Sequence, residues 1–481
     1  MDYLPIILII LLIISIGLNL LYLSIDSSSM DIVNQMGIGY NLGNIFDCYN
    51  NTIKILNPDE QIKLCGNEPP TKQMIKNIKK CGFKTIRLPV TWINFIDELG
   101  NINSNWMSKI KEVVDWIINL NMFCILNIYH DGESGNWLSE GLNSKNKYIN
   151  LWKQIAEEFK MYDELLIFES MNKLDYISEN NNNYRNILLS LNQAFVDVVR
   201  NSGINNKKRL LLICDSNKDD LSNLLEYKIP NDPYNKLAMA LHYYFPLRFS
   251  KECDDNPWQY IVPGEYEYTI EPLVTWGSEN DYKDIISDFE FLKKIFINKG
   301  IPVIIVEIGV LTEQKKEIES IREYLYAIFS LSNDYNGIMS CLWDTSNKKY
   351  GDFNYYDRGK NEWYDERIKK NFYEISKGRY TKITEYYINT NLKTVKNDKN
   401  EDYLSINIGT KKILKVIYNI KNGISLNFKD VRNSHSIITS DINGDWCPIS
   451  NKNTNIKKEY DGSYTFTIDF KNQIYNDYIR I

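Results

Sequence analysis

Short apolar runs alternate with longer amphipathic stretches along most of this chain. Several of the runs consist almost entirely of Val, Ile and Leu, a pattern typical of strands that are buried on both faces of a parallel sheet. We therefore predict one strand for each run. The eight predicted strands are Met36–Leu42, Thr85–Val90, Phe123–Ile128, Leu165–Phe168, Leu210–Ile213, Leu237–His242, Val303–Val306 and Ile338–Trp343.

The stretches between these runs have the spacing of amphipathic helices. In one of them, Leu188, Leu191, Ala194 and Val198 fall on a single stripe, because residues three and four apart lie on the same face of a helix. The predicted helices are Thr71–Cys81, Trp106–Leu120, Tyr148–Phe159, Tyr184–Arg200, Tyr282–Asn298, Lys315–Phe329 and Glu366–Ile375.

Eight predicted strands, seven of them followed by a predicted helix, indicate eight strand–helix units and so predict an α/β fold, a closed (β/α)8 TIM barrel with loop insertions, over residues 31–383. An open, doubly wound parallel sheet is the alternative. That fold usually carries a glycine-rich turn that leads from the first strand into a helix. The segment Gly37-Ile38-Gly39 lacks both the third glycine and the helix, so we favour the barrel.

The pattern changes near Thr384. Beyond it, short alternating runs are separated by turn dipeptides such as Asn422-Gly423 and Asp461-Gly462, which predicts a small all-β sandwich over residues 384–481. Whether this region binds polysaccharide or only supports the barrel stays open. The runs are Tyr403–Ile408, Lys412–Ile420, Ser436–Ser440 and Ser463–Phe470.

The N-terminal segment Leu4–Leu23 is almost wholly apolar and contains no charged residue. About 20 such residues can cross a bilayer as a helix, and the apolar core of a signal peptide is usually only about 7–15 residues long. We therefore predict that residues 1–30 form a transmembrane signal anchor or a signal peptide. The rest of the chain would then lie outside the cell or at its surface, either anchored or secreted after cleavage.

Composition narrows the possible partners. The net charge of -6 argues against nucleic acid, which needs a basic face. Three histidines and no CxxC pair argue against a zinc site, and no metal or cofactor is expected. The eight cysteines fit an oxidising compartment. Cys48 and Cys65 flank a predicted loop and are the expected disulfide, whereas Cys124, Cys214 and Cys341 lie in apolar runs and are expected to be buried thiols.

Polar and aromatic side chains follow several predicted strands at the point where each strand ends. In a (β/α)8 barrel, reactive groups gather at the carboxyl ends of the strands. Each residue alone has a structural explanation, since arginines pair with carboxylates and histidines and tryptophans pack in cores. Together they indicate a site. They are Arg87, Tyr129, His130, Glu169, Asn172, Lys173, His242, Tyr244, Glu307 and Trp343.

Several of these residues lie in segments that resemble the cellulase-like glycoside hydrolase family 5. The segments follow that family's order from residue 36 to about residue 345, and the resemblance does not extend to the N-terminal segment or to the C-terminal region. They are residues 36–44 (MGIGYNLGN), 82–92 (GFKTIRLPVTW), 125–131 (ILNIYHD), 166–173 (LIFESMNK), 191–196 (LNQAFV), 241–244 (LHYY) and 301–309 (IPVIIVEIG).

The resemblance implies a retaining hydrolysis of β-1,4-linked glucan or of a related polysaccharide such as mannan. Two carboxylates then flank the scissile bond about 5–5.5 Å apart. Glu307 is implied as the nucleophile, Arg87 as the group that keeps it ionised, and Asn172 as the partner of the sugar 2-hydroxyl. The side chains implied around the reacting sugar are His130, His242, Tyr244 and, as a stacking platform, Trp343.

The sequence departs from the family pattern at the acid/base position. The family has its acid/base glutamate directly after the asparagine, and this chain has Lys173 there; the family's paired histidines on strand 3 become Tyr129 and His130. We expect a protonated Lys173 to lie within ion-pairing distance of Glu307. A cation cannot act as the base of the second step, and loss of general acid–base catalysis costs about 10²–10⁴-fold.

Three functions remain open from the sequence. The first is a cellulase-like hydrolase, impaired by Lys173, that recruits another acid; Glu169 and Asp175 are the nearby carboxyl groups. The second is a catalytically inactive pseudoenzyme that binds glycan at the cell surface. The third is a surface scaffold, suggested only by the predicted anchor and the C-terminal region. Restoring glutamate at position 173 separates the first two.

Overall fold

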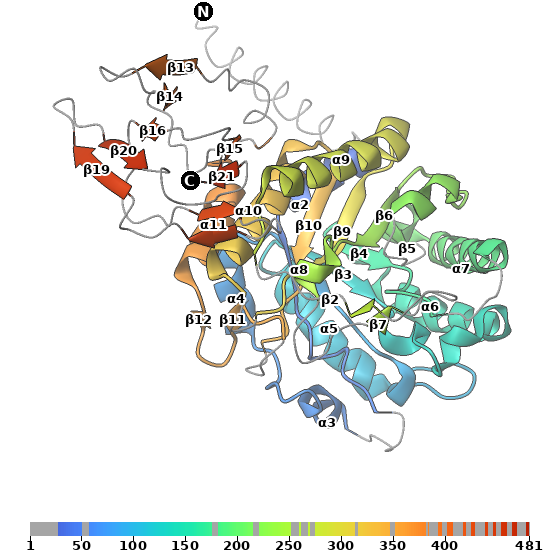
Figure 1. Cartoon of the computed structure of the whole chain (residues 1–481). Coiled ribbons are helices and arrows are strands. Elements are labelled where there is room, and N and C mark those ends of the chain that lie inside the picture. Colours follow the sequence, from blue (N-terminus) through green and yellow to red (C-terminus); the bar gives the residue numbers. More distant parts are fainter. Residues whose placement is uncertain are drawn as a thin grey trace, which may run out of the picture. The chain divides into compact units, whose positions relative to one another are not determined.

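The computed structural model contains a closed barrel of parallel strands in the order β1-β10-β9-β6-β5-β4-β3-β2 (Figure 1). The barrel prediction is confirmed and the open sheet is wrong, because β1 pairs with both β2 and β10. Each predicted strand is present. The barrel strands are β1 (Gly39–Asn41), β2 (Thr85–Leu88), β3 (Phe123–Asn127), β4 (Leu166–Glu169), β5 (Leu211–Cys214), β6 (Leu237–His242), β9 (Val303–Ile308) and β10 (Ile338–Leu342).

The structure describes most of the predicted barrel region and separate strands beyond it. The described residues are 27–50, 57–175, 181–214, 221–251, 259–260, 268–269, 275–312, 316–346, 352–380, 383 and the C-terminal strand segments given below. The apolar segment Leu4–Leu23 lies outside them. Among the helices that are described, none has the length and apolar character needed to cross a bilayer. The membrane anchor therefore stays a prediction.

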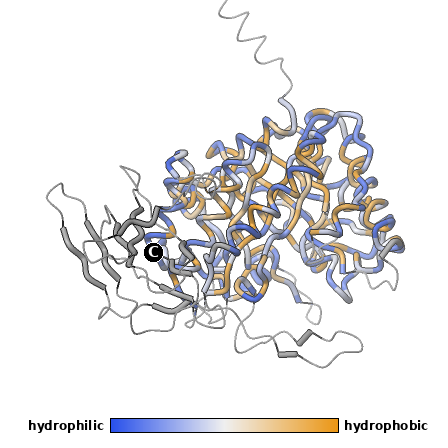
Figure 2. The backbone as a smooth tube through the Cα atoms, turned by 45° about the horizontal axis from the view of Figure 1, so that its top comes forward, coloured by the Kyte–Doolittle hydropathy of each residue, from blue (hydrophilic) through white to orange (hydrophobic). Residues whose placement is uncertain are grey.

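Helices lie near the seven positions expected from the sequence, and the structure adds three that were not predicted, Ser29–Met36, Pro58–Lys63 and Leu247–Ser250. Their first turns are capped by the side chains that the sequence supplies: the Thr71 hydroxyl accepts from the Met74 N–H at 3.1 Å, and Asp365 accepts from the Arg367 N–H at 2.7 Å. Orange and blue alternate along the helices in Figure 2, as amphipathic helices require. The helices are α2 (Ser29–Met36), α3 (Pro58–Lys63), α4 (Lys72–Lys80), α5 (Ser104–Ile118), α6 (Lys145–Phe159), α7 (Asn181–Asn201), α8 (Leu247–Ser250), α9 (Glu279–Ile295), α10 (Ile318–Asp334) and α11 (Glu366–Ser376).

The barrel interior is filled by side chains from most of the strands and is packed against α2. Ile32, Val33 and Met36 of α2 are almost fully buried and join one apolar cluster with residues of the strands, among them Ile125 and Ile304. Full burial of an aliphatic side chain of this size contributes about 1.5–3 kcal/mol. This packing fixes the barrel and leaves the opposite, carboxyl ends of the strands for polar side chains.

The C-terminal region contains strands, as its alternating pattern predicted. They form separate small sheets, with orders β13-β14-β16, β15-β21-β17-β18 and β19-β20. Packing of these sheets into a sandwich, and the boundary at residue 384, stay predictions. The strands are β13 (Lys393–Lys396), β14 (Asp402–Ile406), β15 (Ile417–Asn419), β16 (Ser425–Phe428), β17 (Ile438–Ser440), β18 (Trp446–Pro448), β19 (Thr454–Lys458), β20 (Tyr464–Ile468) and β21 (Tyr478–Arg480).

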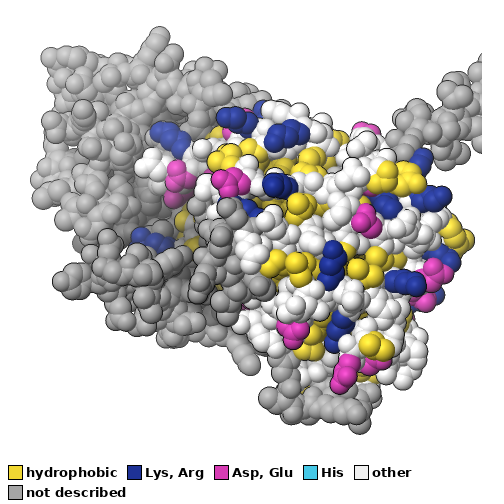
Figure 3. Space-filling model, turned by 90° about the vertical axis from the view of Figure 1, so that its right-hand side faces the viewer, with side chains coloured by type: hydrophobic (Ala, Val, Ile, Leu, Met, Phe, Trp, Pro, Cys, Tyr) yellow, Lys and Arg dark blue, Asp and Glu magenta, His cyan; other side chains and the backbone are white. Residues whose placement is uncertain are grey.

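Charged and apolar side chains are interspersed on the face of the barrel shown in Figure 3. A shallow groove of about 510 Å³ lies between α6 and α7. None of the predicted site residues lines it, so it has no part in the chemistry of the strand ends. Its lining residues are Lys145, Ile149, Asn186, Leu189, Ser190, Gln193, Ala194, Asp197, Val198 and Ile229.

Candidate active site

Arg87 is the centre of a buried polar network at the carboxyl ends of the strands. Its side chain is fully buried, and it donates to both carboxylate oxygens of Glu169, at 2.7 and 2.6 Å. It also donates to Glu307 Oε1 at 2.9 Å and to the amide oxygens of Asn41 and Asn172, at 3.0 and 2.7 Å. All five guanidinium N–H groups can therefore be used, and one cation is shared between two buried carboxylates.

Glu307 lies at the end of β9, in register with His242 of β6, and is 5% exposed. Its Oε1 accepts from Arg87 and, at 2.7 Å, from the Tyr129 hydroxyl. Its Oε2 accepts from the Tyr244 hydroxyl at 3.1 Å and lies 3.3 Å from His242 Nδ1. Burial acts to raise the pKa of Glu307, but His242, Arg87 and Tyr129 outweigh it and hold the pKa at about 2. The carboxyl group is ionised at neutral pH.

His242 connects Glu307 to Asn172. Its Nε2 lies 3.0 Å from Asn172 Oδ1, which also accepts from Arg87. Burial lowers the pKa of His242 to about 4, and Glu307 acts in the opposite direction. At neutral pH the ring therefore carries one N–H, which can serve Glu307 or Asn172 but not both.

Lys173 does not pair with Glu307, and the sequence prediction of that ion pair was wrong. Within the described part of the chain, its Nζ lies 3.3 Å from Glu133 Oε1 and 3.2 Å from Asp175 Oδ2. Burial acts to lower the pKa of Lys173, but Asp175 and Glu133 raise it above its ordinary value. Lys173 is held as a cation by carboxylates of the loops that follow β3 and β4, outside the Arg87 network.

Glu133 is a site residue that the sequence analysis missed. Besides Lys173, its carboxylate lies 2.7 Å from His130 Nδ1 and accepts from the Tyr49 hydroxyl at 3.0 Å. Burial acts to raise the pKa of Glu133, but His130 and Lys173 bring it down to about 2. Gly132 allows the β3 loop to approach, since a Cβ there would lie 2.1 Å from the Lys173 carbonyl oxygen. The tight glycine beside a glutamate was the only sequence signal.

Trp343, which is expected to be a stacking platform for the sugar, is 8% exposed. The Tyr129 ring lies parallel to it, with ring centroids 5.7 Å apart and planes inclined by 4°. Gly43 borders the six-membered ring of the indole, where a Cβ would lie 2.9 Å from Trp343. Tyr129 therefore contacts both the expected platform and the expected nucleophile.

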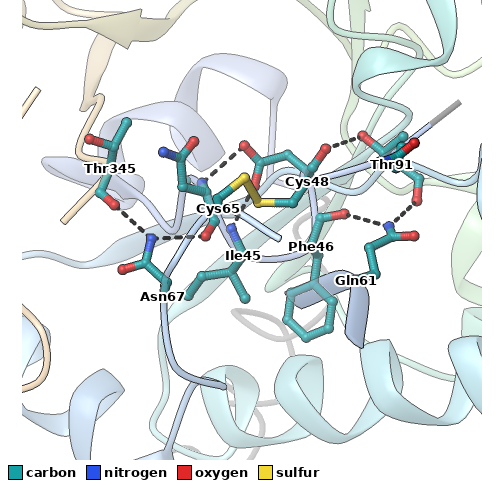
Figure 4. The surroundings of a disulfide bond; sticks show 12 residues. Ile45, Phe46, Cys48, Gln61, Cys65, Asn67, Thr91 and Thr345 are labelled. Carbon is teal, nitrogen blue, oxygen red and sulfur yellow. Dashed lines mark hydrogen bonds between the residues drawn. A yellow bond between two sulfur atoms is a disulfide. The ribbon is translucent and has the colours of Figure 1, made fainter. Parts of the chain in front are cut away.

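The loop after β1 is fixed by the predicted disulfide between Cys48 and Cys65, which the structure contains (Figure 4). Asn67 donates to the Asn44 and Thr345 carbonyl oxygens, at 3.0 and 2.9 Å, and Gln61 donates to the Thr91 carbonyl oxygen at 3.2 Å. Tyr49 belongs to this loop, and its hydroxyl donates a hydrogen bond to Glu133. The thiols expected to be buried are buried; they are Cys124, Cys214 and Cys341.

We expect the double variant Cys48→Ser/Cys65→Ser to lose about 3 kcal/mol of unfolding free energy, because the crosslink restricts the unfolded chain over a loop of this length. The two cysteines are 17 residues apart. Urea unfolding measures the loss, and the wild-type chain with reductant should show the same loss. Equal midpoints for the variant and the oxidised wild-type chain would contradict this expectation.

The predicted site residues fall into two adjoining groups. Arg87, Asn172, His242, Tyr244 and Glu307 form one hydrogen-bonded network. His130 and Lys173 instead meet at Glu133. No group of three or more His, Cys, Asp or Glu residues is placed to hold a metal ion in the portion of the chain that the structure covers. The site therefore contains one ionised and oriented carboxylate, Glu307, and one cation that is held by ion pairs, Lys173.

Comparison with known proteins agrees with this geometry. The chain matches the family Cellulase (glycosyl hydrolase family 5) over residues 49–349. Endoglucanase A of Paenibacillus barcinonensis is 32% identical over 346 residues, which cover 67% of this chain and 80% of that protein. Endoglucanase A of Clostridium longisporum is 30% identical over 357 residues, 71% of this chain and 65% of that protein.

Solved structures match over the same region. A GH5-4 broad specificity endoglucanase from an uncultured bovine rumen ciliate is 50% identical, with a TM-score of 0.71, and the match covers 74% of this chain and 99% of that one. A GH5 family lichenase from Caldicellulosiruptor sp. F32 is 29% identical, with a TM-score of 0.63, over 72% of this chain and 95% of that one. A mutant of that lichenase has been solved in complex with cellotetraose.

Proposed function

Because this chain belongs to the cellulase family, glycosyl hydrolase family 5, we propose that its barrel binds β-1,4-linked glucan across the carboxyl ends of its strands. We further propose that Glu307 is a competent nucleophile and that position 173 supplies no proton donor. The protein is then a retaining β-glucan hydrolase in which cleavage of ordinary glucan is strongly impaired. The single observation that carries this proposal is the ion pairing of Lys173 with Glu133 and Asp175.

The nucleophile half of the reaction is supported by the state of Glu307. Its pKa is held at about 2, so the carboxylate is charged at any pH at which glucan would be bound. Arg87 and the tyrosines Tyr129 and Tyr244 fix its orientation. An ionised, oriented carboxylate is what formation of a glycosyl-enzyme ester requires.

The proton-transfer half lacks a suitable group. Lys173 has a raised pKa and two carboxylate partners, so it keeps its proton when a glycosidic oxygen leaves. Glu169 is fully buried and bound by Arg87 through both oxygens, which supports a structural role. Asp175 is occupied by Lys173. Without acid–base catalysis, cleavage is slower by about 10²–10⁴-fold or more for an alkoxide leaving group.

Leaving-group dependence tests this proposal. The purified full-length chain is given carboxymethyl cellulose and, separately, 2,4-dinitrophenyl β-cellobioside. Dinitrophenolate leaves without a proton, so we expect rapid release of the phenolate from the cellobioside and little reducing sugar from the polymer. Added azide should accelerate turnover of the cellobioside and give a β-glycosyl azide, because an anionic nucleophile needs no general base.

Glu307→Gln is the control for both substrates and should abolish phenolate release. Substantial Glu307-dependent release of reducing sugar from the polymer by the wild-type chain would overturn the impairment. A second candidate function, glycan binding without any cleavage, is favoured by the same Lys173 ion pairs. It would be supported by cellotetraose binding together with no phenolate release.

A further inference from the structure

Four side chains face the carboxylate oxygens of Glu307. A carboxylate offers about four lone-pair sites, two on each oxygen. Arg87 and Tyr129 occupy those of Oε1, at 2.9 and 2.7 Å. The Tyr244 hydroxyl and His242 Nδ1 face Oε2, at 3.1 and 3.3 Å. The shortest of these four contacts comes from Tyr129, the residue that replaces a family histidine.

Tyr129 is held in this position by the groups around its ring. The side chain is 4% exposed. Its ring is parallel to Trp343, the Arg87 guanidinium lies 5.4 Å from its centroid, and the His130 ring meets it edge-on at 4.5 Å. Burial raises the pKa of Tyr129 well above its ordinary value, and Glu307 adds to the shift. The phenol therefore stays protonated and continues to donate.

We propose that Tyr129 is a positioning residue that restrains Glu307 and so slows its attack on the anomeric carbon. This effect is independent of the loss of acid–base catalysis at Lys173. To attack, one carboxylate oxygen must direct a lone pair at the anomeric carbon. A phenol hydrogen bond at 2.7 Å withdraws electron density from that oxygen and must be weakened or displaced as the bond to carbon forms. The ring also lies parallel to Trp343, the expected stacking platform, with ring centroids 5.7 Å apart. This inference rests on the proposed role of Glu307 as nucleophile.

The test isolates the step in which Glu307 attacks. With 2,4-dinitrophenyl 2-deoxy-2-fluoro-β-cellobioside, the C1–O bond to the phenol breaks as Glu307 bonds to C1. The electron pair leaves as dinitrophenolate, no proton is transferred, and the fluorine slows hydrolysis of the ester that forms. Lys173 has no part in this step. Intact mass and phenolate release give the labelling rate of the full-length chain, and peptide mapping locates the label.

We expect Tyr129→Phe to raise the labelling rate roughly 10- to 100-fold, the effect of losing one hydrogen bond to a charged group. The acid limb of the labelling rate should also move to higher pH, because the pKa of Glu307 rises when a donor is removed. A change that only disturbed packing would not move this limb. Tyr129→His should act in the same direction and serves as a second variant in case the phenylalanine variant does not fold.

Tyr335→Phe is the matched control. It removes another hydrogen bond from a tyrosine to a glutamate, Tyr335 to Glu290, of the same 2.7 Å length, and neither residue takes part in the hydrogen bonds described for the site. Its labelling rate should equal that of the wild-type chain. An unchanged or slower rate in both Tyr129 variants would overturn the proposal, as would the absence of label in every protein while cellotetraose still binds. The impairment by Lys173 is judged separately, on release of sugar from polymeric glucan.

Discussion

Replacing Lys173 with glutamate should raise the rate at which this chain hydrolyses carboxymethyl cellulose by about 10²–10⁴-fold. The change supplies the carboxyl group that protonates the leaving oxygen and then activates water. Glu307, the proposed nucleophile, is already ionised, because its pKa is held at about 2. If Tyr129 restrains Glu307 as proposed, the rate increase of Lys173→Glu should lie near the lower end of this range. The double variant Lys173→Glu/Tyr129→His should then show a larger increase than Lys173→Glu alone.

The surroundings of position 173 favour a proton donor once the lysine is removed. Glu133 and Asp175, which now share one cation, would then face a third carboxyl group. Like charges raise the pKa of an acid, so the introduced group should stay protonated into the mildly acidic range. We expect an alkaline limb to appear in the pH profile of the variant, and no such limb between about pH 5 and 9 in the wild-type chain, where Lys173 stays protonated.

Reducing-sugar assays across this pH range measure both effects. Lys173→Gln is the matched control, since it removes the cation without adding an acid, and it should give neither the rate increase nor the alkaline limb. If the glutamine variant gains as much as the glutamate variant, the lysine acts by blocking the subsite and not by replacing a proton donor. If neither gains although both bind cellotetraose, the missing acid is not what limits hydrolysis.

Arg87→Met should be the most destabilising single change in the site, at about 3–5 kcal/mol near neutral pH. It leaves Glu169 and Glu307, which are 0% and 5% exposed, without their shared cation. Both carboxyl groups would then have to protonate or draw in water. Arg87→Lys is the matched control; it keeps the charge but cannot reproduce the paired bonds to Glu169, so its loss should be smaller.

The sign of the pH dependence separates a charge effect from a packing effect. In the wild-type chain the lowered pKa of Glu307 contributes stability that is complete above about pH 4.5 and is lost as the pH falls toward about 2. Without Arg87 this contribution disappears and the buried carboxyl groups favour protonation. The deficit of Arg87→Met should therefore shrink from pH 7 to pH 4 in urea unfolding experiments. A deficit that stays constant over this range would contradict the role of charge.

Sequence analysis predicted the barrel well because its strands are buried on both faces. A run such as Val303–Val306 has no polar position until Glu307, so the strand and the residue at its end are identified together. Arg87 and His242 were found in the same way. Their meeting at one network follows from the closed barrel, which brings strand ends from distant parts of the sequence to one face.

The part of the site that is built by loops could not be predicted from the sequence. Lys173 lies four residues after the last residue of β4, and the direction of its side chain depends on how the β3 loop folds around Gly132. Apart from Gly132 beside the glutamate, nothing in the sequence indicated that this loop brings Glu133 to the lysine, and so an ion pair with Glu307 was predicted instead. The stacking of Tyr129 on Trp343 was missed for the same reason: periodicity says which face a residue is on, but not which ring it meets.

Arg87 binds side chains from β1, β4 and β9 as well as the residue Asn172 that follows β4. Those strands cannot separate without breaking buried ionic hydrogen bonds, so opening this part of the site amounts to opening the barrel itself. Amide hydrogens of these strands should therefore exchange with deuterium only through global unfolding. The Glu133–Lys173 pair joins only two loops, so the amide hydrogens of these loops should exchange through a local opening of lower free energy. Glu307, the proposed nucleophile, and Lys173 would then belong to two separate units of local unfolding, and a bound glucan that contacts both would couple them.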